Sequence, residues 1–119
     1  DKSVLAFPCG GGNGSAYTVY AFSTDNFEEV KGEWDIGTYP ERVCFNPAGD
    51  ILFGTNGDPY DNNLYIMNTT TYECIKKLSF PNGSDYSIFT TNSSGTVLVG
   101  FSYDTYYDDN HALYFYTIE

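Results

Sequence analysis

The sequence predicts an all-β fold in which one group of antiparallel strands is repeated along the chain. Runs of about four to eight residues, rich in Val, Ile, Leu, Tyr, Phe and Thr, recur from one end to the other. Clusters such as Asn-Pro-Ala-Gly-Asp, Pro-Asn-Gly and Asn-Ser-Ser-Gly separate these runs and are strong turn signals. No segment of useful length has the 3.6-residue apolar period of an amphipathic helix. We therefore expect strands throughout and no helix longer than one turn.

A repeat of about 47 residues organises the strands, and periods of this size indicate solenoids, propellers or arrays. Its length of 119 residues makes the chain one domain, 1–119, with approximate units 1–39, 40–85 and 86–119. Shifting the chain against itself aligns four sets of runs: SVLAF (3–7) with ILFGT (51–55) and TVLVGF (96–101); AYTVYAFST (16–24) with NLYIMNTTT (63–71) and ALYFYTIE (112–119); NFEEVKGEWDI (26–36) with TYECIKKLSF (71–80); and ERVCFNPAGD (41–50) with YSIFTTNSSG (86–95).

The strands follow in the same order in each unit. The unit 40–85 has four of them, the first unit lacks the first strand and the last unit lacks the fourth, which makes ten. The runs LYIM and LYFYTI are apolar at nearly every position, as in strands covered on both faces, so we expect sheets stacked on sheets. The turns at 46–50 and 92–95 should be equivalent, with Gly49 and Gly95 at positive φ.

The stretch PERVCFNPAGDILFGTN…NNLYIMNTTTYECIKKLSF resembles a blade of the β-propellers of the YVTN/WD40-like group. The matching features are Pro40 before the first strand, the turn at 46–50, and the polar hairpin at 68–71. The resemblance implies four-stranded antiparallel blades, about three in number, against the four to eight that close a propeller. A β-sandwich of ten strands is the alternative. Propellers carry unrelated functions, so the resemblance predicts architecture and not activity.

Three units leave open edges, which predicts association. We expect a homo-oligomer, or pairing with the remainder of a longer propeller chain, through the first and last strands. The expected contact residues are Val4, Leu5, Leu113 and Phe115. The function favoured by these features is a non-catalytic, structural module for self-assembly or protein interaction.

The charge narrows the choice of partners. Sixteen acidic residues against five basic ones give a formal net charge of -11, which repels nucleic acid and anionic membrane surfaces. No apolar run approaches the roughly 20 residues that cross a bilayer. We therefore expect neither nucleic acid binding nor membrane insertion. A neutral glycan or a cation suits this charge better.

Antiparallel topology places the long connections at one end of the units, and these are rich in Tyr and Asp. A lectin-type carbohydrate site is therefore the alternative function, with the candidate ligand-binding residues Tyr60, Asp61, Tyr103, Asp104, Tyr106, Tyr107, Asp108 and Asp109. No cofactor is expected, although carboxylate oxygens also suit Ca²⁺. The candidate Ca²⁺ ligands are Asp58, Asp61, Asp104 and Asp108, without the spacing of an EF-hand.

Catalytic signatures are scarce in the sequence. His111 is the single histidine, and no G-x-S-x-G motif occurs. The remaining enzyme hypothesis is a glycosidase that uses Asp108 and Asp109 as its pair of carboxylates. This hypothesis is unfavourable because side chains of adjacent residues rarely converge on one glycosidic bond. We therefore expect a protein that is not an enzyme.

Cysteines and sequons bear on the compartment. The three cysteines form no C-x-x-C pair and favour three buried thiols over one disulfide with one free thiol; they are Cys9, Cys44 and Cys74. Four N-x-S/T sequons indicate a secreted or cell-surface glycoprotein, with candidate glycosylation at Asn13, Asn68, Asn82 and Asn92.

Overall fold

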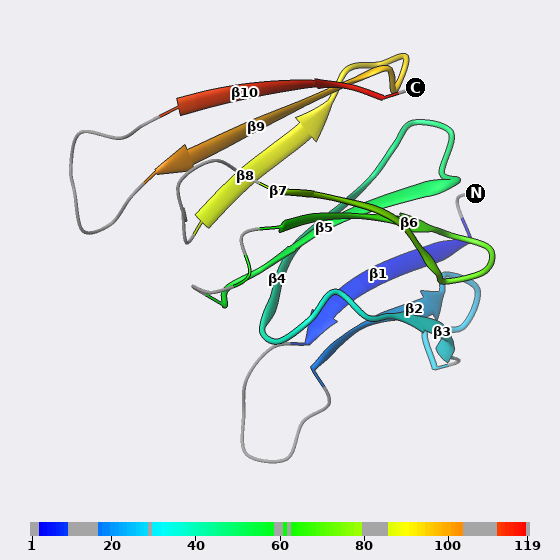
Figure 1. Cartoon of the computed structure of the whole chain (residues 1–119). Helices are drawn as coiled ribbons and strands as arrows, with labels where there is room; N and C mark the ends of the chain where they lie inside the picture. The colour runs from blue at the N-terminus through cyan, green and yellow to red at the C-terminus, as the bar shows by residue number, and fades with distance from the viewer. Residues whose placement is uncertain are drawn as a thin grey trace.

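A computed structural model shows an all-β protein and confirms the predicted fold class (Figure 1). The structure describes residues 3–9, 17–28, 30–58, 61, 63–79, 86–103 and 112–118, with only the backbone described for 86–89, 101–103 and 112. This part contains ten strands and no helix. The strands are β1 (Val4–Cys9), β2 (Thr18–Ser23), β3 (Val30–Trp34), β4 (Pro40–Phe45), β5 (Ile51–Asn56), β6 (Asn63–Asn68), β7 (Cys74–Ser79), β8 (Tyr86–Thr91), β9 (Val97–Tyr103) and β10 (Ala112–Thr117).

The strands form three antiparallel sheets in which each strand pairs with its neighbour along the chain. Sheet 1 has the order β1-β2-β3, sheet 2 the order β4-β5-β6-β7 and sheet 3 the order β8-β9-β10. The last two strands of sheets 1 and 2 carry the same irregularity, since the register shifts after Ala21 in β2 and after Ile66 in β6. Matching bulges show that these two sheets are built alike, strand by strand.

The predicted equivalence of two turns is confirmed. Gly49 has φ 79° and Gly95 has φ 71°. In each turn an asparagine side-chain oxygen accepts from the first amide of the next strand: Asn46 Oδ1 from Ile51 N at 3.1 Å, and Asn92 Oδ1 from Val97 N at 2.9 Å. The side-chain oxygen mimics a backbone acceptor, which closes the turn and starts β5 and β9 in the same register.

The three sheets stack face to face, and the first strands adjoin, because β4 contacts both β1 and β8 (Figure 1). We call the side of a sheet that points to the preceding sheet its front face, and the side that points to the following sheet its back face. Side chains of β6 alternate between the two. Tyr65 and Met67 join the core between sheets 1 and 2, while Leu64 and Ile66 join the core between sheets 2 and 3. The prediction that LYIM is covered on both faces is confirmed.

The junction between sheets 1 and 2 centres on Trp34, which is completely buried. Its Nε1 donates to the carbonyl of Asn68 at 2.9 Å, so one hydrogen bond links the two sheets. Tyr72 follows the hairpin after β6, at φ 63°, and its ring lies 5.0 Å from that of Trp34. A Cβ added at Gly32 would lie 2.5 Å from the Tyr72 ring. Tyr72 is therefore a front-face aromatic of sheet 2 that is seated on a glycine of sheet 1.

Candidate functional site

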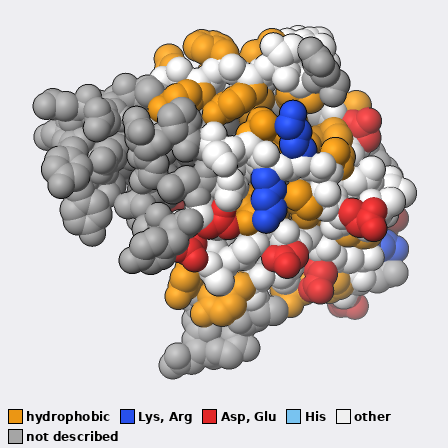
Figure 2. Space-filling view, viewed as in Figure 1, with side chains coloured by type: hydrophobic (Ala, Val, Ile, Leu, Met, Phe, Trp, Pro, Cys, Tyr) orange, Lys and Arg blue, Asp and Glu red, His pale blue; other side chains and the backbone are white. Residues whose placement is uncertain are grey.

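The open faces at the two ends of the stack are the most prominent candidate site. Within the described residues no sheet covers the front face of sheet 1, which exposes Leu5, Phe7 and Phe27. These residues and Phe22 line a hollow of about 370 Å³. On the back face of sheet 3, Leu113 and Phe115 are exposed, and Phe115 keeps 68% of its surface open to solvent. Figure 2 shows hydrophobic side chains at the upper edge of the molecule, over β10, and again at its lower edge.

The open front face of sheet 1 repeats the buried front face of sheet 2. The cross-strand pair Leu5–Phe22 occupies the position of the pair Leu52–Met67, as the registers and the bulges require. Leu52 and Met67 are completely or almost completely buried against sheet 1. The open front face of sheet 1 therefore has apolar residues at the same positions as the front face of sheet 2, but no neighbouring sheet buries them.

The hairpin of sheet 1 also repeats that of sheet 2. Phe27 N donates to the carbonyl of Ser23 at 3.0 Å, as Tyr72 N donates to that of Asn68 at 3.1 Å. Phe27 has φ 56°, against 63° for Tyr72. Tyr72 packs on Trp34 of the preceding sheet, but Phe27 is 62% exposed. Phe27 is thus the counterpart of a contact residue.

The open back face of sheet 3 matches the buried back face of sheet 2 in the same way. The pair Val99–Phe115 occupies the position of the pair Phe53–Ile66. Both residues of the latter pair belong to the core between sheets 2 and 3. Of the four residues expected at the edges, Leu5, Leu113 and Phe115 are exposed, whereas Val4 packs against the core between sheets 1 and 2.

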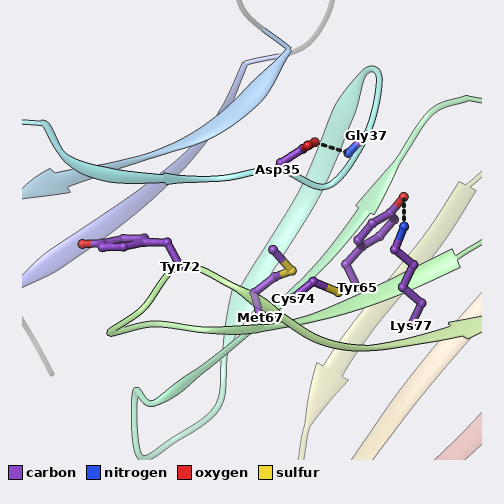
Figure 3. Close-up of a pocket in the computed structure, with 7 residues that line it drawn as sticks. All are labelled: Asp35, Gly37, Tyr65, Met67, Tyr72, Cys74 and Lys77. Carbon is purple, nitrogen blue, oxygen red and sulfur yellow. Dashed lines mark hydrogen bonds between the residues drawn. The ribbon is translucent and has the colours of Figure 1, made fainter.

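A second, polar site lies between sheets 1 and 2 and has a volume of about 330 Å³. Figure 3 shows Asp35 and Gly37, from the connection between β3 and β4, across from side chains of β6 and β7. The other lining residues are Tyr65, Met67, Tyr72, Cys74 and Lys77. Asp35 Oδ1 accepts from Gly37 N at 3.0 Å, and Lys77 Nζ donates to the Tyr65 hydroxyl at 3.4 Å.

Asp61 links β5 and β6 beside this pocket. Its carboxylate accepts from the Tyr65 hydroxyl at 2.5 Å, from Asn56 Nδ2 at 2.9 Å and from Asn63 Nδ2 at 2.6 Å. Partial burial acts to raise the pKa of Asp61, but these three hydrogen bonds and the charge of Lys77 outweigh it and lower the pKa. For Tyr65, burial and the adjacent carboxylate both raise the pKa. The three hydrogen bonds give Asp61 a structural role in holding the end of β5 to the start of β6.

The expected calcium ligands are only partly described. Asp58 Oδ2 accepts from Thr38 Oγ1 at 2.6 Å, and Asp61 has the partners given above. Within the described ranges, no group of three or more His, Cys, Asp or Glu residues is placed to hold a metal ion. Tyr103 ends β9 and is not in a loop, and only its backbone is described. The predicted residues that lie outside the described ranges are Asn13, Tyr60, Asn82, Asp104, Tyr106, Tyr107, Asp108, Asp109 and His111.

Two tyrosines outside the predicted set of ligand-binding residues meet beside Asp58. Tyr17 and Tyr39 are 42% and 46% exposed, and their ring centroids are 5.2 Å apart at an interplanar angle of 74°. The pKa of Tyr39 is raised, chiefly by a hydrogen bond with Tyr17 and by the electrostatic interaction with that same residue. Burial and the charge of Asp58 raise it further, to a smaller extent. In the sequence, the position of Tyr39 in a turn just before Pro40 is the feature that could have indicated this pair.

The cysteines and two sequons are described. All three cysteines are free thiols, but the prediction that all are buried is wrong, since Cys74 is exposed and Cys9 and Cys44 are half-buried. Burial raises the pKa of Cys44 to about 11. Asn68 Oδ1 accepts from the amides of Thr70 and Thr71, and Asn92 closes its own turn. Both sequon asparagines thus have structural roles in turns.

Comparison with known proteins supports the fold alone. No protein-family model and no curated protein sequence matches the chain. Among solved structures, hydrazine synthase of Kuenenia stuttgartiensis is similar, with a TM-score of 0.58 and 14% identity over 98% of this chain. The chain spans 43% of the length of that structure. Nowhere in the described part is there a helix long and apolar enough to cross a membrane.

Proposed function

We propose that the chain is a non-catalytic association module whose two open end faces each bind a further β-sheet of the same class. The observation that carries this proposal is the equivalence of exposed and buried positions. Phe27 stands where Tyr72 is seated on a neighbouring sheet, and Phe115 stands where Ile66 is buried by one. The resemblance to propeller blades supports it, because a propeller closes only when every sheet has two neighbours.

A second copy of the chain is the partner we propose, in a head-to-tail arrangement. Every junction inside the chain joins a back face to a front face. The open front face of sheet 1 and the open back face of sheet 3 therefore form a matching pair. Such a heterologous contact leads to a ring or, without closure, to a fibre.

The apolar area is sufficient to contribute substantially to binding. The rings of Phe7, Phe27 and Phe115 are each more than half exposed. Each therefore leaves on the order of 100 Å² to cover. At about 25 cal/mol per Å², the three rings provide roughly 7 kcal/mol before association costs. Because those costs are of similar size, we expect binding to need the complete faces and not the rings alone.

Light scattering of the purified chain at several concentrations tests this proposal. We expect a mass of at least twice 13.3 kDa at micromolar concentration. Phe27→Asp and Phe115→Asp should each lower it, because a charge in a covered apolar face is costly. The matched control is Ile75→Asp, at an exposed apolar residue of β7 outside both end faces. A monomer at all concentrations, or equal loss with the control, contradicts the proposal.

A secreted or cell-surface location is also proposed, on the basis of the four sequons. Asn92, Ser93 and Ser94 are exposed in their turn. A glycan on Asn92 Nδ2 would replace one of the hydrogen bonds that this atom donates to Ser94 and Thr96. Expression through a eukaryotic secretory pathway, followed by a glycan-removing enzyme and mass measurement, tests this. A mass that does not change on treatment contradicts it.

A further inference from the structure

Three residues other than glycine have positive φ in the described ranges, and all three are aromatic: Phe27, Tyr39 and Tyr72. Bulky residues rarely adopt this conformation, which costs on the order of 1 kcal/mol or more. Tyr72 is seated on a neighbouring sheet, and Phe27 is its counterpart on the open front face. Tyr39 has no such role, because its ring contact is with the equally exposed Tyr17.

Tyr39 is held in place by contacts from a different connection. Its carbonyl accepts from Gly57 N at 2.8 Å, and the neighbouring Thr38 Oγ1 donates to Asp58 Oδ2 at 2.6 Å. Asp58 N in turn donates to Asn56 Oδ1 at 3.0 Å. These bonds tie the connection before β4 to the one after β5. The ring is therefore presented to solvent by a fixed backbone.

We propose that Tyr17, Thr38, Tyr39 and Asp58 form a binding site for an uncharged saccharide. In an edge-to-face pair the edge of one ring contacts one face of the other, so the contact takes up only one of that ring's two faces, and the two side chains remain 42% and 46% exposed. Tyrosine provides rigid, amphipathic contact area at low entropic cost. The hydroxyl proton of Thr38 is donated to Asp58. The Asp58 carboxylate and the Thr38 hydroxyl oxygen therefore offer acceptors for the hydroxyl groups of a sugar.

The charge and the size of the site favour a saccharide over other ligands. The net charge of -11 repels acidic ligands. A cage for an organic cation needs ring faces that converge on one point, and rings inclined at 74° with centroids 5.2 Å apart leave no such gap. Two rings provide far less than the roughly 800 Å² that each partner contributes to a standard protein interface. This site is independent of the end faces.

NMR titration of the complete chain with trisaccharides of glucose, mannose, galactose and N-acetylglucosamine, each up to about 10 mM, tests the proposal. We expect at least one to shift the amide signals of Thr38, Tyr39 and Asp58. Tyr39→Gly should weaken that binding at least about tenfold without lowering the melting temperature, because glycine adopts positive φ freely. Tyr17→Ala should weaken it as well, and Ile75→Ala, at an exposed apolar residue of β7 outside both end faces, should not.

Three outcomes overturn the proposal. In the first, none of the four trisaccharides shifts these amide signals. In the second, Tyr39→Gly and Tyr17→Ala, both shown to be folded by circular dichroism, bind as the unsubstituted chain does. In the third, choline shifts the same signals at lower concentration than any saccharide, which makes the pair a cation site.

Discussion

Gly32→Ala tests the seating of Tyr72 on the neighbouring sheet. The new Cβ would lie 2.5 Å from the Tyr72 ring, so the ring, Trp34 or the backbone must move. Overpacking of this kind costs about 1 to 3 kcal/mol, and alanine recovers about 0.5 to 1 kcal/mol of the entropic penalty of glycine in a strand. We therefore expect a net loss of about 1 kcal/mol, and at most about 2.5 kcal/mol, in the free energy of unfolding.

Urea unfolding followed by the fluorescence of Trp34, the single tryptophan, measures this loss next to the substituted site. The Phe115→Asp background keeps association from adding to the apparent stability. Gly57→Ala is the control, because the three atoms nearest to its new Cβ belong to the exposed side chain of Glu41 and not to a ring packed between two sheets. Adding Tyr72→Ala should remove the cost of Gly32→Ala. A change equal to that of the control would refute the seating.

Three further predictions concern the turn, Asp61 and the thiols. Gly95→Val should cost about 1 kcal/mol or more in urea unfolding, because valine is strained at φ 71°, and an unchanged midpoint would count against the turn. Asp61 has a lowered pKa, so its contribution to stability is present above its unfolded pKa near 3.8 and is lost as pH falls towards the folded value. Asp61→Asn should flatten the pH dependence of stability in that acidic range, and a parallel pH profile would oppose this role. With a disulfide reagent at pH 8, Cys74 should react much faster than Cys44, whose pKa is raised to about 11; equal rates would contradict the burial of Cys44.

Much of the architecture could be predicted because it depends on local chemistry. Asparagine and glycine at fixed offsets define the turns after β4 and β8, and these residues are visible in the sequence. Continuous apolarity in LYIM indicated cover on both faces without identifying the partner. In LYFYTI the same pattern could not determine which set faces out. The structure turns Leu113 and Phe115 outward, and Tyr114 and Tyr116 pack against the core.

The site was less predictable, because its contacts join distant segments. Asp61 has the residue type of a ligand, but Asn56 and Tyr65 bind it only once β5 and β6 are paired. Aromatic residues at positive φ contradict backbone preference, so Phe27 and Tyr72 could not be assigned from propensity. The alignment of NFEEVKGEWDI (26–36) with TYECIKKLSF (71–80) already pairs these two residues, at the second position of each run, but it does not show that either one is a contact residue.

Mixing two variants tests the central claim of head-to-tail association most directly. Phe27→Asp leaves the back face of sheet 3 intact, and Phe115→Asp leaves the front face of sheet 1 intact. Each variant alone should be a monomer of about 13.3 kDa by light scattering. Their equimolar mixture should form a heterodimer of twice that mass, because one unchanged front face meets one unchanged back face. A mixture that stays monomeric while the unsubstituted chain assembles, or a single variant that still dimerises, would contradict the account.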